Sequence, residues 1–141
     1  MIEKDFLKAS AEDRAKYVLR PYDDLPLTKL VEGSESHLVT TKKMTISFLT
    51  MHADSVFELH SHDHEQCMIV LDGYCDELIG TKMYRVQKGD VIFLPAKIPH
   101  GAFIREVDCK VIDIFVPRRD DYACKMHMQH PSYPIKFDDT I

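Results

Sequence analysis

From residue 44 onward the chain alternates short apolar runs with turns, and this spacing limits the possible folds more than any other feature of the sequence. The turns contain glycine, as in Gly73 and Lys88-Gly89-Asp90. Runs of about 5–8 residues at this spacing are typical of an antiparallel sandwich or barrel. The predicted strands are Met44–Met51, Val56–Leu59, Cys67–Leu71, Tyr74–Ile79, Met83–Val86, Val91–Leu94, Ala102–Arg105 and Lys110–Val116. The sequence therefore predicts an all-β fold.

The segments before residue 44 and after Pro117 lack this alternation of apolar runs and turns. Ser10 to Leu19 starts with a possible N-cap serine and acidic residues and ends with bases, so we expect a short helix there. The segment after Pro117 contains further prolines and no strand period, which predicts an irregular C-terminal tail. We therefore divide the chain into an N-terminal helix and extended segment packing on the barrel (1–43), the barrel (44–122) and a tail (123–141).

Composition excludes several classes of protein. A chain of 141 residues and 16.3 kDa suits one domain. A net charge of −5 argues against a nucleic-acid binder, which needs a basic surface. No apolar run approaches the roughly 18 residues of a membrane span, and no signal segment is visible. The four cysteines are widely spaced, which favours reduced thiols. We expect a cytoplasmic protein that binds neither nucleic acid nor membrane.

A histidine-rich stretch within the strand region predicts a metal site. His60 and His62 are one residue apart, so on a β-strand their imidazoles point to the same side. Gln66 keeps this parity and is a third ligand if the pairing stays regular, whereas Glu65 faces away. His100 would complete a nitrogen and oxygen set suited to one divalent first-row metal. The alternative is a set of ordinary histidines that match the pattern by coincidence.

Other side chains leave alternatives open. His64 could be a ligand, but the turn residues around it favour a place at the rim of the site. Glu65 could be a ligand if the strand bulges there. His127 and His130 could suggest a second metal pair, but with no ordered element predicted around them we interpret them as tail histidines. Two further histidines are interpreted as ordinary polar positions: His37 and His52.

Asp113 lies in an apolar run, Val111–Val116, whose two faces are both apolar. Its carboxylate therefore cannot simply point to open water, and burying it unpaired is costly. Asp113 must face either a partner or the interior of the barrel beside a cation. A structural ion pair with Arg119 or Lys110 is the alternative to a functional role. Phe115 shares the face of Asp113.

The spacing of these residues resembles the two motifs of the cupin family. The first motif has two histidines, a carboxylate or amide, and then a glycine, which here is Gly73. The second runs from Gly89 through Pro95 to His100. The resemblance implies a small jelly-roll β-barrel. Three positions depart from the family pattern, in turns rather than at ligands: Asp54, Lys97 and Ile104.

One cupin subgroup is similar over roughly residues 44 to 122. The stretches 60–66, 70–73 and 113–122 resemble the KdgF-like cupins of pectin and alginate degradation, which open unsaturated uronic acid monomers into linear ketouronates. The resemblance implies four metal ligands: His60, His62, Gln66 and His100. It places three pocket residues on Asp113, Phe115 and Arg119.

These observations predict a metal-dependent lyase or isomerase for a small anionic oxygenated substrate, such as an unsaturated uronate. One divalent metal (nickel, zinc, manganese, cobalt or iron) would act as a Lewis acid. Asp113 would be the acid/base, Arg119 would hold a substrate carboxylate, and Phe115 would wall the site from water. One alternative is an iron-dependent dioxygenase, although the common facial triad has a carboxylate in place of Gln66. The other is a non-catalytic small-molecule-binding cupin.

The expected partners are a small-molecule substrate and a second copy of the chain. Related barrels form dimers. The outer face of Lys110–Val116 is apolar and needs cover, which also favours a homodimer.

Overall fold

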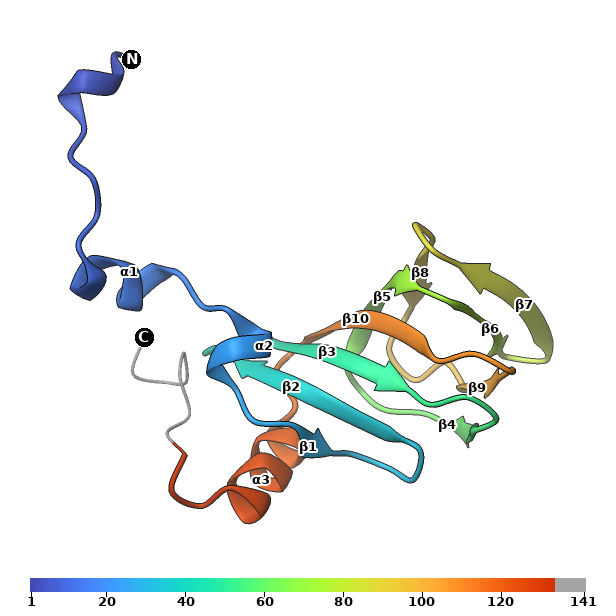
Figure 1. Ribbon diagram of the computed structural model, residues 1–141. Coiled ribbons are helices and arrows are strands. Elements are labelled where there is room, and N and C mark those ends of the chain that lie inside the picture. The colour runs from blue at the N-terminus through green and yellow to red at the C-terminus, as the bar shows by residue number, and fades with distance from the viewer. Residues whose placement is uncertain (134–141) are drawn as a thin grey trace.

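The computed structural model describes residues 1–133, and its strands form two antiparallel sheets (Figure 1). The larger sheet has six strands in the order β1-β2-β3-β10-β5-β8, and the smaller has four in the order β4-β9-β6-β7. The predicted all-β jelly-roll fold is confirmed. The strands are β1 (Thr28–Lys29), β2 (Ser34–Thr40), β3 (Thr45–Met51), β4 (Val56–His60), β5 (Glu65–Asp72), β6 (Tyr74–Ile79), β7 (Lys82–Gln87), β8 (Val91–Leu94), β9 (His100–Ile104) and β10 (Cys109–Val116).

Every predicted strand is present, and β1 and β2 are additional. The inward positions of β2 include Ser34, Ser36 and Thr40, so the strand lacks the apolar alternation that would identify it. A hydrogen bond of 2.6 Å between the buried hydroxyls of Ser36 and Ser47 links β2 to β3 in place of an apolar contact. The larger sheet therefore extends into the segment that precedes residue 44.

The N-terminal segment contains the short helices η1 (Glu3–Asp5), α1 (Ala11–Tyr17) and α2 (Pro21–Asp24). The predicted cap of α1 is present, since the Asp13 N–H donates to Ser10 Oγ and the Ser10 N–H donates to Asp13 Oδ2. No residue of α1 is buried, and this part of the chain projects away from the sheets (Figure 1). Contact with the barrel comes from α2, whose Tyr22 ring lies 5.7 Å from the ring of Phe48.

The irregular tail predicted from residue 123 is wrong up to Gln129, because α3 spans Asp120–Gln129. Pro117 lies before this helix and Pro131 after it, so the prolines delimit the helix and do not interrupt it. Asp120 in the first turn suits the positive end of the helix dipole. The last part of the predicted tail, residues 134–141, lies outside the described residues.

Helix α3 packs beside β1 and the loop that follows it (Figure 1). The side-chain amide of Gln129 accepts from the Lys29 N–H and donates to the Lys29 carbonyl. Lys125 Nζ donates to the Leu30 carbonyl at 2.8 Å, and Met126 is buried. The helix is thereby held at one end of the larger sheet. None of the helices among residues 1–133 combines the length and apolar character that crossing a membrane requires.

The apolar core lies between the sheets and includes the buried side chains of Met68, Val70 and Ile104. Strands β4 and β9 approach closely at Gly101, where an added Cβ would lie 2.4 Å from the Phe57 carbonyl oxygen. Only glycine fits at this distance. The close approach matters because this strand pair places His60 directly opposite His100.

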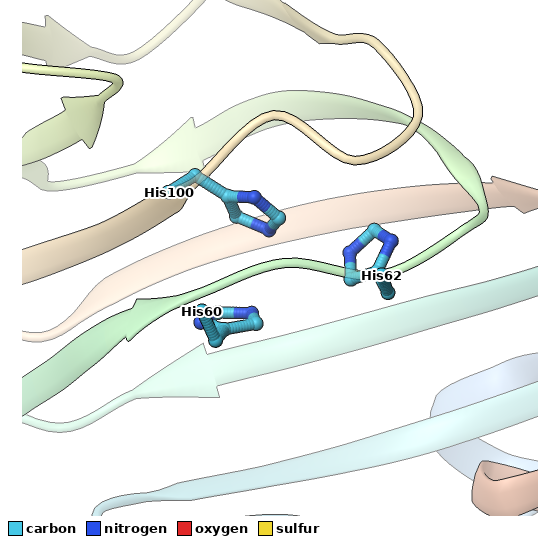
Figure 2. A group of neighbouring side chains, drawn as sticks. All are labelled: His60, His62 and His100. Atoms are coloured by element: carbon cyan, nitrogen blue, oxygen red, sulfur yellow. The ribbon is translucent and has the colours of Figure 1, made fainter.

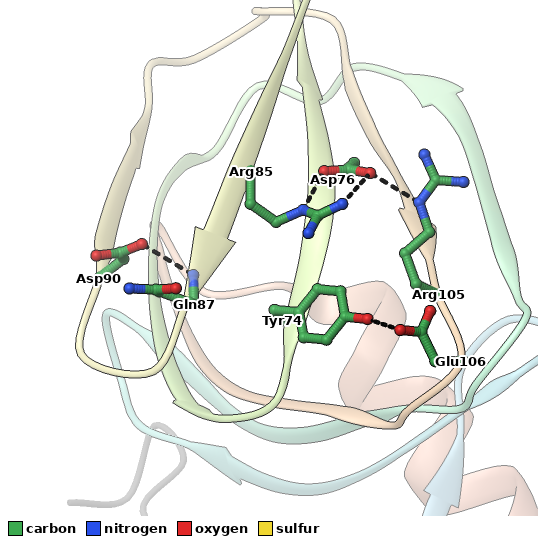
Figure 3. Close-up of polar contacts among 7 residues, drawn as sticks. All are labelled: Tyr74, Asp76, Arg85, Gln87, Asp90, Arg105 and Glu106. Atoms are coloured by element: carbon green, nitrogen blue, oxygen red, sulfur yellow. Dashed lines mark hydrogen bonds and ion pairs between the residues drawn. The ribbon is translucent and has the colours of Figure 1, made fainter.

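Asp76 is the centre of an ion-pair network on the smaller sheet (Figure 3). Arg85 Nε lies 2.6 Å from its Oδ1, and Arg105 Nε lies 2.7 Å from its Oδ2. The two guanidinium groups lower the pKa of Asp76 to about 2. Close by, Tyr74 donates a hydrogen bond to Glu106. The Gln87 N–H donates to Asp90 Oδ2 where β7 turns into β8.

We predict that Asp76→Asn lowers the free energy of unfolding near neutral pH by about 1–2 kcal/mol, a value that allows for the solvent exposure of both arginines. The pKa of this carboxyl is about 2 in the folded protein against an ordinary value of 3.8. Its contribution is therefore complete above about pH 4 and is lost as the pH falls through 2. Urea unfolding of both proteins should show their difference shrinking between pH 4 and 2. A difference that stays constant would contradict this account.

Candidate metal centre

The structure brings His60, His62 and His100 together (Figure 2). His60 ends β4 and is paired with His100 at the start of β9. His62 follows in the link to β5, and its ring centroid lies 4.8 Å from that of His100. One nitrogen of each ring lies within 4.8 Å of the others. Two imidazoles from the end of β4 and the link after it, and one from the start of β9, thus surround one point.

The prediction that His60 and His62 share a strand is wrong. Strand β4 ends at His60, and a short irregular link carries His62. The position of this link is fixed by a hydrogen bond of 2.7 Å from the Lys97 N–H to the His62 carbonyl. Parity therefore does not orient Gln66. Gln66 faces the interior because it belongs to the inner row of β5, opposite Phe115 of β10.

Backbone carbonyls hold all three imidazole rings in place. Nδ1 of His60 contacts the Glu58 carbonyl at 2.9 Å, and Nδ1 of His100 contacts the Ile98 carbonyl at 2.9 Å. Nδ1 of His62 contacts the His64 carbonyl at 3.0 Å. A carbonyl can only accept, so Nδ1 carries the proton in each ring. Each Nε2 therefore keeps its lone pair, which is the form that binds a metal.

Gln66 adds an oxygen to this set. Its amide nitrogen donates to Asp113 Oδ1 at 2.8 Å, which turns Oε1 toward Nε2 of His62 at 3.1 Å. Both of these facing atoms carry lone pairs and neither carries a proton. A cation bound by both atoms would remove their repulsion. The donor set, three imidazoles and an amide oxygen, thus fits a divalent first-row metal.

The neighbouring candidate ligands lie outside this group. Glu65 is exposed at the start of β5, on the opposite face to Gln66. His64 packs its ring against those of His62 and Phe115 at 5.4 and 6.4 Å. Among the described residues, Nδ1 of His64 is one of the few buried polar atoms without a hydrogen bond. His64 therefore contacts two residues of the site without joining the three convergent histidines.

The electrostatic environment favours neutral imidazoles. Burial lowers the pKa of His100 to about 4, although the hydrogen bond to Ile98 opposes the shift. Burial, and then the positive charge of Arg119, lower the pKa of His62. Both rings are therefore uncharged near neutral pH. With a neutral amide as the fourth donor, a bound dication would keep its full charge for polarising a substrate.

The centre opens into a cavity of about 420 Å³ between the sheets. Asp113 faces this cavity from β10, and burial raises its pKa to about 7. The hydrogen bond from Gln66 and the charge of Arg119 oppose this rise. Asp113 forms no ion pair with Arg119 or Lys110 in the part of the chain that the structure describes. Its partner is the Gln66 amide, so the structural ion pair weighed as an alternative is absent there.

Phe115 and Arg119 border the same cavity. The Phe115 ring is buried and contacts the His62 ring at 5.7 Å between centroids. Arg119 lies between aromatic rings, with its guanidinium carbon 3.7 Å from the centroid of Tyr122 and 4.9 Å from that of Phe115. Its Nη2 and Nε contact Asp121 at 2.7 and 3.2 Å. Tyr122 and Asp121, which the sequence analysis did not select, come from the unpredicted helix α3.

The remaining histidines have structural contacts of their own. His130 contacts the Leu27 carbonyl through Nε2, and His37 contacts the Leu25 carbonyl through Nδ1. His52 lies 3.2 Å from Glu35. His127 lies on α3, which gives it the ordered setting that the sequence analysis did not expect. Within residues 1–133 it joins no group of three possible ligands.

Glu77 is the cavity residue that the sequence analysis missed most clearly. It lies on β6 beside Asp76, and both side chains are buried. Neighbouring residues on a strand face opposite sides, so one of two consecutive acids must face the interior. That pattern, present in the sequence, could have identified an inward carboxyl. Asp76 takes the outer face, and Glu77 lines the cavity.

Comparisons with known proteins agree with this structure. A family model described as "Cupin domain" matches residues 47–115. The fold is similar to that of KdgF from a Halomonas species, at 27% sequence identity and a TM-score of 0.64, covering 69% of this chain and 90% of that chain. None of the curated proteins matches the chain.

Two more distant structures are similar in fold alone. One is an RmlC-like cupin from Shewanella frigidimarina, at 20% identity and a TM-score of 0.66, covering 71% of this chain and 90% of that chain. The other is the oxalate decarboxylase OxdC of Bacillus subtilis, at 17% identity and a TM-score of 0.62, covering 70% of this chain and 29% of that chain. The matched family model and the jelly-roll architecture together show that this chain is similar to the cupins over residues 47–115.

Proposed function

We propose that this protein is a metal-dependent lyase or isomerase that acts on a small anionic oxygenated substrate, such as an unsaturated uronate. The observation that carries the proposal is the link from the histidine centre through Gln66 to the buried carboxyl of Asp113. The link connects a buried carboxyl, which we propose as the proton-transfer group, to the candidate metal site in one cavity. The resemblance to KdgF-like cupins supports the choice of substrate class.

The proposed ligands are His60, His62, Gln66 and His100. Nickel, zinc, manganese, cobalt and iron all suit this donor set. When bound, the metal would supply Lewis acidity toward a substrate hydroxyl or carboxylate. Imidazole and amide ligands add no negative charge, so a bound dication would keep its formal charge for polarising the substrate.

Opening an unsaturated uronate is an isomerisation. The bond between the anomeric carbon and the ring oxygen breaks as the anomeric hydroxyl loses its proton and becomes an aldehyde. The ring oxygen becomes an enol oxygen, and the enol becomes a ketone when the far carbon of the double bond gains a proton. Asp113 is suited to take the first proton and return one to carbon, because its pKa of about 7 lets it do both near neutral pH.

Arg119 is suited to bind the carboxylate of the substrate. Nε and Nη2 of Arg119, which form one edge of the guanidinium group, donate hydrogen bonds to the Asp121 carboxylate. The end-on pair of N–H groups, on Nη1 and Nη2, points away from Asp121 and matches a carboxylate. The rings of Tyr122 and Phe115 fix the plane of the guanidinium. Phe115 also shields the proposed reacting groups from water.

The alternatives receive less support from the geometry. An iron-dependent dioxygenase commonly has a carboxylate ligand, but the amide of Gln66 lies between Asp113 and His62. A non-catalytic binding protein would need Asp113 only to orient Gln66, whereas its pKa of about 7 also suits proton transfer. Binding of uronates without their conversion would favour that second alternative.

We predict that metal-loaded protein converts a 4,5-unsaturated monouronate to its linear keto acid, measured as loss of the ultraviolet absorbance of the conjugated double bond. Asp113→Asn should slow this reaction roughly 100- to 10,000-fold, because the amide cannot carry the proton. Elemental analysis should show unchanged metal content, since asparagine still accepts from Gln66. The matched control is Asp72→Asn, an exposed acid on β5. Full activity of Asp113→Asn would remove the proposed acid/base.

We predict that natively purified protein holds one divalent transition metal per chain. His100→Ala should bind that metal at least tenfold more weakly, because it removes the buried imidazole of the set. A chelator should lower the unfolding temperature of the wild type but not of this variant. His52→Ala, away from the centre, serves as the control. Undiminished metal content in a His60→Ala/His100→Ala double variant would show that the ion binds elsewhere.

We also propose a homodimer formed through the outer face of the six-stranded sheet. Ile112 and Ile114 are half-buried there, and Phe93 at the sheet edge is 74% exposed. Such an apolar face favours association. We predict that light scattering gives twice the chain mass of 16.3 kDa and that Ile112→Lys/Ile114→Lys restores the single mass. Met83→Lys, on the other sheet, should leave the dimer intact. A monomeric wild type would contradict the proposal.

A further inference from the structure

Two carboxyl groups lie at the same depth below the histidine centre, one on each sheet. On the smaller sheet, His100 is paired with Ile79, and the next inward-facing pair is Ala102 with Glu77. On the larger sheet, Gln66 is paired with Phe115, and the next inward-facing pair is Met68 with Asp113. Glu77 and Asp113 therefore each lie one inward-facing pair below the histidine centre, and their side chains enter the cavity from opposite sheets.

Glu77 is buried but has no polar partner. Only 4% of its surface is exposed, and its neighbours around the cavity include Met51, Met68 and Ala102. Within residues 1–133 no hydrogen bond or ion pair reaches its carboxyl group. Asp113 differs, because the Gln66 amide donates to it. The carboxyl oxygens of Glu77 are not among the fully enclosed polar atoms that lack a hydrogen bond, so they face the cavity, where water or a ligand can bind them.

The environment keeps Glu77 in its acid form. Burial raises its pKa well above the ordinary value, and the negative charge of Asp113 raises it further. Glu77 lacks the amide donor and the nearby guanidinium that favour ionisation of Asp113, so its environment favours the acid form. It presents to the cavity one O–H donor and one carbonyl acceptor. This pair can both donate to and accept from a ligand hydroxyl, and it can donate to a carbonyl oxygen.

We propose that Glu77 is a specificity-determining residue, which binds a hydroxyl or carbonyl oxygen of the substrate at the inner end of the cavity. Arg119 comes after the end of β10, beyond Phe115, whereas Glu77 lies further into the barrel. Arg119 and Glu77 therefore border the cavity at different depths. A ligand that spans them carries a carboxylate at one end and a hydroxyl or carbonyl at the other. This inference rests on the proposed function for the placement of the carboxylate at Arg119.

The test measures binding without turnover. Isothermal titration of the metal-loaded full chain compares galacturonate, a hydroxylated carboxylate, with cyclohexanecarboxylate, which has a similar ring and no hydroxyl. The wild type should prefer galacturonate. Glu77→Met should reduce that preference roughly tenfold to a hundredfold, because an apolar side chain leaves the hydroxyl unpaired. Glu77→Gln, which keeps a donor and an acceptor in the same shape, should stay within about threefold of the wild type.

The outcomes separate this inference from the proposed function. An unchanged preference in Glu77→Met, or a wild type that does not favour galacturonate, would overturn the role of Glu77 even if the protein opens uronates. A Glu77-dependent preference in a protein that converts no uronate would support this inference and contradict only the proposed reaction. Thermal unfolding confirms that each variant is folded, and Glu77→Leu replaces Glu77→Met if that variant does not fold.

Discussion

The hydrogen bond between the Gln66 amide and Asp113 is the contact on which the candidate site depends. It fixes which atom of the amide faces the histidines, because the nitrogen must donate to the carboxylate and the oxygen must then face His62. It also supplies the polar partner that a buried carboxylate needs. One side chain thus belongs both to the candidate metal centre and to the proposed proton-transfer group. Its inward direction follows from the pairing of β5 with β10 and needs no special local conformation.

The backbone around the centre explains why departures from the family pattern do not disturb it. Asp54 and Lys97 stand where glycines are expected, and both adopt positive φ angles, 62° and 69°. A side chain in this region costs roughly 1–2 kcal/mol, so the turns are kept at the expense of some stability. At Lys97 the benefit is visible, since its N–H donates to the carbonyl of His62. The strained turn therefore holds the link that carries the ligand.

The sequence allowed good prediction wherever a periodic pattern coincided with burial, and poor prediction elsewhere. Most strands between Thr45 and Val116 follow apolar alternation, so they could be placed closely, whereas the largely exposed β4 and β7 were identified mainly by the turns around them. Strand β2 was missed because the buried Ser36–Ser47 pair replaces apolar contact, and α3 was missed because its flanking prolines resembled loop signals. His62 does converge with His60 and His100, as predicted. The reason given for it, a shared strand face, was wrong, because the link that carries His62 is not a strand and has no side-chain period.

The two inward carboxyl groups show how one cavity can assign different states to similar groups. Asp113 has an amide donor and the charge of Arg119 to stabilise its ionised form, whereas Glu77 has only apolar neighbours and the charge of Asp113. Different surroundings can thus suit one carboxyl to exchanging a proton and favour the acid form of another in the same cavity. The difference arises from the sheets themselves. On the larger sheet, Gln66 lies one inward-facing position from Asp113 and can donate to it. On the smaller sheet, the inward positions nearest Glu77 hold histidine, isoleucine and alanine. The asymmetry of the site is therefore set by which strand each acid belongs to.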